Sequence, residues 1–206
     1  NKYGKDRVIA LSVSYGQKHD KEIQAAIAVA EYYGVEHLFL DLRKIFTYSN
    51  CSLLKQSTEK IPEESYAKQI SKTNGETPVS TYVPFRNGLF LSSAASIALS
   101  KDCEVIYYGA HADDSAGFAY PDCSPVFNRA MNEAIWEGSG HQLKIEAPFV
   151  NVSKAEVVRI GLELNVPYEL TWSCYEGGEK PCGKCGTCID RAAAFQANHV
   201  EDPALQ

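Results

Sequence analysis

The sequence has 206 residues, of which 45% are hydrophobic and 22% charged, and its formal net charge is −6. These are the proportions of a globular protein, so they exclude the fibrous and disordered classes, and the acidic balance argues against a broad surface for nucleic acid. No apolar run approaches the roughly 18 residues of a membrane span, and residues 1–7 are polar and charged. The sequence therefore predicts a soluble protein without a secretion signal, with small-molecule chemistry as the favoured function.

Strand and helix patterns alternate from the beginning of the chain. The β-rich apolar run at residues 8–15 predicts a strand, and apolar residues at helical spacing then predict a helix that stops at Gly34. Residues 35–42 predict a second strand and residues 88–99 an alanine- and serine-rich helix. Residues 104–109 predict a third strand.

The same alternation continues in the second half of the chain. Ser124 and Pro125 predict a helix start, because proline at the first helical position loses no hydrogen bond. Residues 143–147 predict a short strand, and Ser153 with Glu156 forms a capping-box pattern before another helix. Repeated strand–helix units predict an α/β fold with a doubly wound, mostly parallel sheet, whose ligands bind beyond the carboxyl ends of the strands.

One long connection interrupts this alternation. Residues 43–84 show no clear strand or long helix, and the sequence is polar after Leu54. Connections of this length are commonly lids or mobile segments, so we expect residues 55–80 to be mobile. The expected domain organisation is an α/β domain at residues 1–170 followed by a cysteine-rich segment at residues 171–206.

Four of the seven cysteines fall in one C-terminal stretch, at Cys174, Cys182, Cys185 and Cys188. Without a secretion signal we expect a reducing, cytoplasmic compartment, where clustered thiols are more often metal ligands than disulfides. Two overlapping CxxC units present three thiolates on one loop, and Cys174 can complete a tetrahedron. Zinc suits such a site, and four thiolates leave no open position, so the ion would be structural. An iron–sulfur cluster and disulfides are the alternatives.

Polar segments also follow the ends of the predicted strands. Asp113 and Asp114 form either a turn or a magnesium pair, and the turn is favoured when they are considered alone. Arg86 is either a surface residue or part of an anion site at a helix start. Cys123 is more typical of a small buried residue than of a nucleophile.

Together these segments resemble the 7-cyano-7-deazaguanine synthase family (QueC) of the PP-loop ATP pyrophosphatases. The resemblance covers residues 8–198. It rests on Ser12-Val-Ser-Tyr-Gly-Gln-Lys-His19, Val83-Pro-Phe-Arg-Asn87, Tyr120-Pro-Asp-Cys123 and the four C-terminal cysteines. It implies an adenine nucleotide alpha hydrolase-like fold, with a nucleotide-binding domain at residues 1–170 and a small zinc-binding segment after it.

The resemblance also implies an activity. ATP with Mg²⁺ would drive the conversion of 7-carboxy-7-deazaguanine and ammonia to 7-cyano-7-deazaguanine, through adenylated intermediates, in queuosine biosynthesis. Positioning and neutralisation of phosphate charge would supply the catalysis, because no side-chain nucleophile is required. The implied protein is a cytoplasmic homodimer with no membrane partner and no direct nucleic-acid partner.

Individual roles follow by the same resemblance. The residues implied at the nucleotide are Ser14, Tyr15, Gln17 and Gly109. The residues implied at the substrate are Arg86, Asn87, Tyr120 and Asp122. Arg86 would meet a carboxylate or phosphate, and Tyr120 would stack on the ring. Asp113 and Asp122 are candidates for a metal ion or for the substrate amine. The catalytic candidates are thus Arg86, Asp113 and Asp122.

One family feature is absent from the sequence, the Ser-Gly-Gly-x-Asp-Ser phosphate loop. We expect it among roughly 25 to 40 residues preceding Asn1, the length of one strand, one glycine-rich loop and one helix. Two other interpretations stay open. A tRNA thiolase of the same superfamily would also carry clustered cysteines, but it would need a surface for tRNA. A non-enzymatic, nucleotide-binding zinc scaffold would not need the phosphate loop.

Overall fold

The computed structural model describes residues 2–205 and divides into two compact units. The first unit comprises Asn1–Ser65 and Arg159–Gln206, and the second comprises Tyr66–Val158. The boundary falls inside helix α6 (Lys154–Glu163). The cysteine-rich segment is part of the first unit, and a separate domain beginning after residue 170 stays a prediction.

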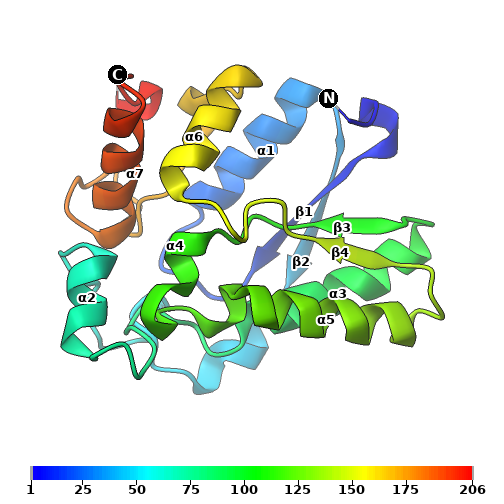
Figure 1. The fold of residues 1–206 in the computed structure, drawn as a ribbon, viewed down its shortest axis with the longest axis horizontal. Helices are drawn as coiled ribbons and strands as arrows, with labels where there is room; N and C mark the ends of the chain where they lie inside the picture. The colour runs from blue at the N-terminus through cyan, green and yellow to red at the C-terminus, as the bar shows by residue number, and fades with distance from the viewer. Residues whose placement is uncertain (1, 206) are drawn as a thin grey trace. The chain divides into compact units, whose positions relative to one another are not determined.

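The first unit is built around two parallel strands. Strand β1 (Ile9–Ser14) pairs with β2 (Glu36–Asp41), from Ile9 opposite Glu36 to Ser14 opposite Asp41. Helix α1 (Lys21–Tyr33) connects the strands and packs on both (Figure 1). Gly34 ends the helix at φ 64°, a left-handed conformation that glycine adopts without a Cβ penalty. The predicted order of strand, helix and strand is confirmed here.

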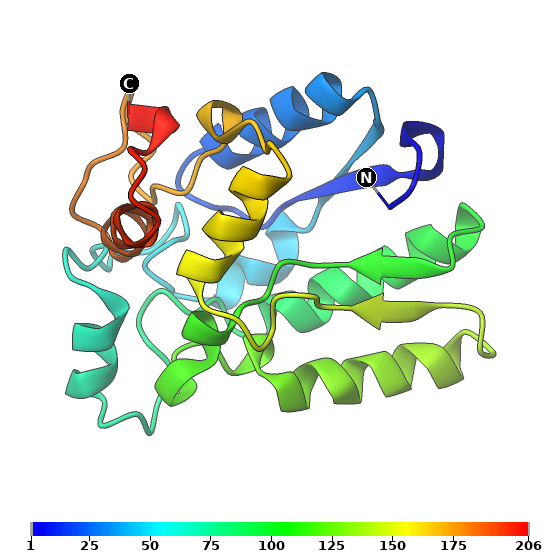
Figure 2. The same ribbon diagram turned by 45° about the horizontal axis from the view of Figure 1, so that its top comes forward.

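The second unit contains the other strand pair. Strands β3 (Val105–Tyr107) and β4 (Lys144–Glu146) run parallel, and helices α3 (Arg86–Ser100) and α5 (Pro125–Gly138) pack beside them (Figure 2). Their apolar faces form the core of this unit, which contains Leu91, Ala95, Ala98, Ile135, Leu143 and Ile145. Each large aliphatic side chain in such a core stabilises the fold by about 1.5–3 kcal/mol.

Helix α5 begins where the sequence predicts it. Pro125 occupies its first turn, and the Ser124 hydroxyl accepts a hydrogen bond of 3.1 Å from the Phe127 amide. At α6, the Ser153 hydroxyl likewise accepts a 3.3 Å bond from the Glu156 amide, as the capping-box pattern predicts.

The strands confirm an α/β fold with parallel pairing. Within residues 2–205 they form two separate pairs, and a single doubly wound sheet is not observed. Strands β3 and β4 are each three residues long, whereas the sequence predicts longer strands at residues 104–109 and 143–147. The β-ladder is shorter because the chain turns into loops at each end.

The long connection contains short helices and no strand between residues 43 and 84. Helix η2 (Arg43–Tyr48) opens it and α2 (Tyr66–Lys72) follows. Several of its apolar side chains are buried, among them Leu53, Leu54 and Val79. Burial anchors these positions, and the mobility of residues 55–80 stays a prediction.

The remaining helices are short except for α7, the C-terminal helix. They are η1 (Lys5–Arg7), α4 (Ala112–Ser115), η3 (Ala116–Phe118), η4 (Pro121–Cys123), η5 (Tyr168–Leu170), α7 (Gly186–Ala197) and η6 (Pro203–Leu205). None of the helices between residues 2 and 205 is both long and apolar enough to cross a bilayer.

Candidate functional site

The four C-terminal cysteines form a compact thiol cluster in the first unit. The Sγ atoms of Cys174, Cys182, Cys185 and Cys188 all lie within 4.8 Å of one another. A tetrahedral zinc ion with bonds of about 2.3 Å would separate its sulfur ligands by about 3.8 Å. The Sγ atoms of Cys182 and Cys188, 4.0 Å apart, are close to that value. The donor set therefore fits a four-thiolate metal site.

The backbone around the cluster is arranged to stabilise thiolates. The Cys182 and Glu176 amides donate to Cys174 Sγ at 3.3 and 3.4 Å, and the Cys185 amide donates to Cys182 Sγ at 3.4 Å. The hydrogen bond between Cys185 and Cys188 lowers the pKa of the Cys185 thiol and raises that of the Cys188 thiol, and burial raises the pKa of Cys174. Such donors orient sulfur ligands and favour their charged form.

Side chains on either side of the cluster hold its loop in place. Trp172 Nε1 donates to the Cys174 carbonyl at 2.8 Å, and Thr187 Oγ1 donates to the Ser173 carbonyl at 2.6 Å. Arg191 on α7 makes a bidentate pair with the buried carboxylate of Asp202, at 2.6 and 2.8 Å. These contacts tie the loop to α7 and to the C-terminal turn.

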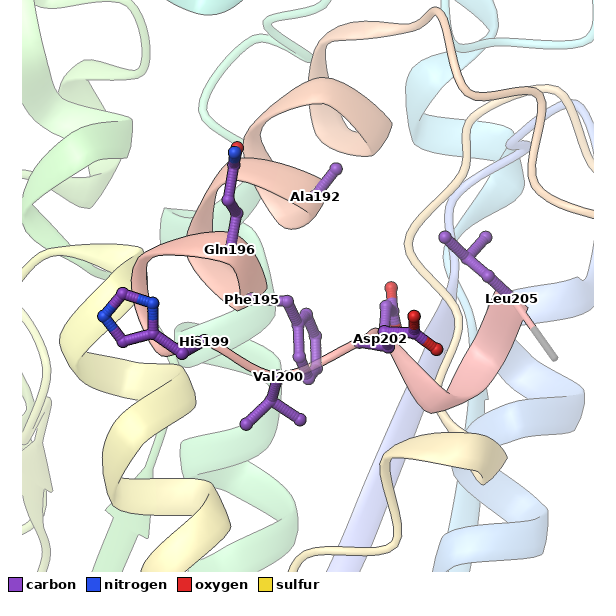
Figure 3. Close-up of a pocket in the computed structure, with 8 residues that line it drawn as sticks. Ala192, Phe195, Gln196, His199, Val200, Asp202 and Leu205 are labelled. Carbon is purple, nitrogen blue, oxygen red and sulfur yellow. The ribbon is translucent and has the colours of Figure 1, made fainter.

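A hollow of about 650 Å³ lies between the end of α7 and the C-terminal turn (Figure 3). Its labelled lining residues are Ala192, Phe195, Gln196, His199, Val200, Asp202 and Leu205. None of them is a predicted site residue, and Asp202 is already paired with Arg191. The hollow therefore does not coincide with the chemistry that the sequence predicts.

The segment after β1 contains the residues expected at the nucleotide in this unit. Tyr15 is 6% exposed, its ring packs edge-on against Phe46, and its hydroxyl donates to Glu22 Oε1 at 3.5 Å. Gln17 is 5% exposed, and its Oε1 accepts the Tyr15 amide at 2.9 Å. Ser14 is half-buried at the strand end. Contact of these residues with adenine stays a prediction.

His19, a few residues further on, connects this segment to the cysteine loop. Its ring lies edge-on to Trp172, with centroids 6.4 Å apart, and its Nδ1 accepts the Lys21 amide at 3.2 Å. A Cβ on Gly177 would lie 2.3 Å from His19 Cγ, so the imidazole fills the space next to that glycine. No spacing pattern in the sequence predicts this contact.

In the second unit, the structure brings together Asn87, Asp122 and Cys123 from two separate segments. The Asn87 amide donates to Asp122 Oδ2 at 2.8 Å. The Asn87 side chain donates to the Asp122 carbonyl at 3.2 Å and to Cys123 Sγ at 3.1 Å. The Asp122 carboxylate therefore caps the N-terminus of α3 as well as occupying the predicted site.

Two carboxylates near Arg86, the buried Asp122 and the half-buried Asp114, share one electrostatic environment. Burial raises the pKa of Asp122, opposed by the Asn87 amide and then by Arg86. Burial also raises the pKa of Asp114, opposed by His111, Lys154 and Arg86. One guanidinium thus stabilises two carboxylates that lack full solvation, which suits a site for a polar or charged ligand.

Tyr120 lies among aromatic side chains of the same unit. Its hydroxyl is 2.5 Å from Thr81 Oγ1, and its ring lies edge-on to Tyr66 at 5.5 Å and 6.4 Å from Tyr82. The residue is 5% exposed. Tyr66, Thr81 and Tyr82 could not be predicted from the sequence, because they lie in the irregular connection where no spacing pattern exists. Stacking of Tyr120 on a substrate stays a prediction.

The segment after β3 separates two aspartates that the sequence could not distinguish. Asp113 is exposed, and its Oδ2 accepts the Lys154 amide at 2.8 Å at the start of α6, so it serves as a capping carboxylate. Asp114 Oδ2 lies 3.3 Å from His111 Nε2. A Cβ on Gly109 would meet no atom within 4 Å, which leaves room for a ligand to approach the backbone. A catalytic role for Asp113 stays a prediction.

Known proteins match almost the entire chain. The profile of the family described as queuosine biosynthesis protein QueC matches residues 1–199. The chain is 42% identical over 199 residues to the 7-cyano-7-deazaguanine synthase of Archaeoglobus fulgidus, covering 96% of this chain and 79% of that relative. It is 42% identical over 193 residues to the protein of that name from Caldicellulosiruptor saccharolyticus, covering 94% and 81%. For the protein of that name from Oceanobacillus iheyensis, the identity is 42% over 196 residues, covering 94% and 84%.

Proposed function

The chain belongs to the QueC family of queuosine biosynthesis proteins, and we propose that it is the enzyme that makes 7-cyano-7-deazaguanine from 7-carboxy-7-deazaguanine, ammonia and ATP. The observation that carries this proposal is the family match over residues 1–199, which includes the four clustered cysteines and every predicted site residue. The grouping of Arg86, Asn87 and Asp122 supports it. The substrate offers a carboxylate, which suits Arg86, and several N–H donors, which suit the carboxylate of Asp122.

The chemistry needs activation of a carboxylate twice. A carboxylate oxygen attacks the α-phosphorus of ATP, a P–O bond forms, and pyrophosphate leaves. Ammonia then attacks the acyl carbon, AMP leaves, and the product is an amide. The amide oxygen attacks a second ATP, pyrophosphate leaves, and the nitrogen loses one proton to give the adenylated amide as a neutral imidate. Loss of AMP and of the remaining N–H proton then gives the nitrile. Two ATP molecules are thus converted to two AMP and two pyrophosphate.

In this reaction the side chains position groups and balance charge. Arg86 holds the substrate carboxylate or a phosphate. Asp122 Oδ2 already accepts the Asn87 amide, so its other oxygen accepts from the N–H edge of the deazaguanine ring. Tyr120 supports the ring, and Mg²⁺ accompanies ATP. By resemblance to the family, Ser14, Tyr15 and Gln17 of the first unit are assigned to the adenine nucleotide.

The cysteine cluster has a structural part in this proposal. Zinc bound by Cys174, Cys182, Cys185 and Cys188 would contribute folding free energy to residues 171–205 and leave no open position for substrate. A single doubly wound PP-loop sheet, a homodimer and a cytoplasmic location complete the proposal, and each is supported by resemblance to the family.

A substrate panel tests the proposal against a tRNA-modifying activity. The full-length protein is incubated with ATP and ammonia, and either 7-carboxy-7-deazaguanine or unmodified tRNA is added. We expect AMP to form only with the small molecule, and mass spectrometry to detect the nitrile. AMP formation that depends on tRNA would contradict the proposal. A zinc-stabilised scaffold without enzymatic activity would produce AMP with neither substrate.

A further inference from the structure

His111 is a buried, titratable residue with no part in the chemistry described above. Its side chain is 12% exposed, and Nε2 lies 3.3 Å from Asp114 Oδ2. The other ring nitrogen, Nδ1, is enclosed and has no hydrogen-bond partner within residues 2–205. Burying a polar atom without a hydrogen-bond partner costs free energy. The unpaired Nδ1 atom therefore points to a ligand that donates a hydrogen bond to it.

The surrounding charges determine which nitrogen of His111 carries the proton. Burial raises the pKa of Asp114, and His111, Lys154 on α6 and Arg86 on α3 oppose this rise. Asp113 on α4 and Lys154 are the other charged groups that act on the imidazole. The Asp114 carboxylate, 3.3 Å from Nε2, favours the tautomer with the hydrogen on Nε2, which leaves the lone pair on Nδ1. Burial also lowers the pKa of His111, in the direction of an uncharged ring.

The pair lies in the same electrostatic cluster as the predicted substrate residues. The charge of Asp114 acts on both Asp122 and Cys123, and Arg86 acts on all three. The backbone reinforces this proximity, because the Tyr120 amide donates to the Asp114 carbonyl at 3.0 Å. His111 Nδ1 is therefore a hydrogen-bond acceptor in the same electrostatic cluster as the predicted substrate residues.

We propose that His111 Nδ1 binds ammonia and accepts its protons during amide and nitrile formation, and that Asp114 is the positioning residue of this base. An enclosed lone pair suits a very small N–H donor, and ammonia is the smallest reactant. The inference rests on the proposed function and adds the group that handles the nitrogen.

Both nitrogen steps balance with this assignment. In the first, the ammonia lone pair forms a C–N bond to the acyl carbon, the C–O bond to AMP breaks, and Nδ1 takes one proton from nitrogen. In the second, Nδ1 takes the N–H proton of the adenylated amide while the third C–N bond forms and AMP leaves. The imidazolium returns its proton to solvent between the steps. No oxidant or reductant is involved.

The test separates adenylation from nitrogen chemistry. His111→Gln places an amide nitrogen close to the Nε2 position, where it can still donate to Asp114, but it has no base in place of Nδ1. Exchange of pyrophosphate into ATP, dependent on 7-carboxy-7-deazaguanine and measured without ammonia, reports adenylation alone. We expect exchange within about twofold of the parent and nitrile formation at least about 100-fold slower, the usual contribution of a general base. His141→Gln, a change at an exposed imidazole, is the matched control and should alter neither rate.

The dependence on pH tests the positioning role of Asp114. In Asp114→Asn the imidazolium loses its carboxylate partner, so the acidic limb of kcat/KM for ammonia should move to lower pH, with less loss of rate than in His111→Gln. Equal loss of exchange and nitrile formation in His111→Gln would overturn the inference, as would unchanged nitrile formation. If the parent protein catalyses neither reaction, the proposed function itself fails. Intact chemistry in both the parent and His111→Gln overturns only the role of His111.

Discussion

Arg86 and the two carboxylates that it stabilises illustrate how a few side chains produce the proposed site. Its guanidinium opposes the effect of burial on both Asp114 and Asp122, and it lies over the Phe90 ring at 5.9 Å. Its position in the first turn of α3 places a cation at the helix end that also receives the Asp122 carboxylate. The local charge balance therefore depends strongly on one residue.

The first prediction concerns Arg86→Ala. Turnover should fall at least about tenfold, equivalent to about 1.4 kcal/mol of transition-state stabilisation, while the melting temperature changes little. Steady-state kinetics and thermal unfolding measure the two effects. Arg129→Ala, at an exposed arginine of neighbouring helix α5, is the control and should leave both unchanged. A large loss of stability with nearly normal turnover would assign Arg86 a structural role.

The second prediction concerns the pH dependence of stability at His111. Burial lowers its pKa in the folded state below the ordinary value of about 6.5, so on acidification the unfolded chain takes up this proton first. The parent should therefore lose stability as the pH falls from about 6.5 toward the lowered pKa. His111→Gln should lose less over the same range, as followed by melting temperature. Identical pH profiles for parent and variant would contradict the burial effect.

At the scale of elements, the loop between Trp172 and α7 links the cysteine cluster to the segment after β1. Gly177 and Gly183 in this loop both have positive φ, 66° and 72°. They differ in the space beside them, because a Cβ on Gly177 would meet His19 at 2.3 Å and one on Gly183 would meet nothing within 4 Å. A substitution at Gly183 therefore introduces backbone strain alone, whereas a substitution at Gly177 adds a steric clash with His19.

The third prediction uses this pair. Gly183→Ala should cost about 1–2 kcal/mol of unfolding free energy from the left-handed backbone alone. Gly177→Ala should cost more, because His19 must also move, and it should raise the KM for ATP if residues 14–17 border the nucleotide. Denaturant unfolding and ATP kinetics measure both. Equal costs in the two variants would show that the contact with His19 contributes nothing.

The fourth prediction concerns Cys185, which is both a cluster ligand and the N-cap of α7. Cys185→Ser should release the metal and loosen the C-terminal segment, because binding of a structural ion is part of the folding free energy. Metal analysis should show about one zinc per chain in the parent, and limited proteolysis should show cleavage after residue 170 in the variant. Cys103→Ser, outside the cluster, should keep its metal. A metal-free variant that remains soluble and fully active would contradict a structural ion.

Most elements of the fold could be predicted from sequence because their signals are local. Gly34 ends α1 and Pro125 begins α5 through backbone preferences that do not depend on distant contacts. The pairing of strands in two separate sheets depends on tertiary packing and could not be predicted in this way. Helix α2 could not be predicted from local sequence either, because the burial of its Tyr66 depends on the distant contact with Tyr120.

The site was predictable to a similar extent. The cysteine cluster follows from spacing alone, since ligands so close in sequence cannot lie far apart. The double role of Asp122 as α3 cap and site residue is visible only in the structure, and so is the pairing of His111 with Asp114 rather than Asp113. Asp113 and Asp114 are adjacent in the sequence. The structure distinguishes them because Asp113 accepts a hydrogen bond from the Lys154 amide at the start of α6.

At the scale of the whole molecule, this chain uses ATP to convert a carboxylate into a nitrile. The most direct measurement supplies the full-length protein with ATP, 7-carboxy-7-deazaguanine and ¹⁵N-labelled ammonia, and quantifies AMP and product by mass spectrometry. The account predicts a nitrile that contains ¹⁵N, with two AMP formed for each nitrile. AMP release without incorporated nitrogen, or a product that stops at the adenylated acid in the presence of ammonia, would contradict it.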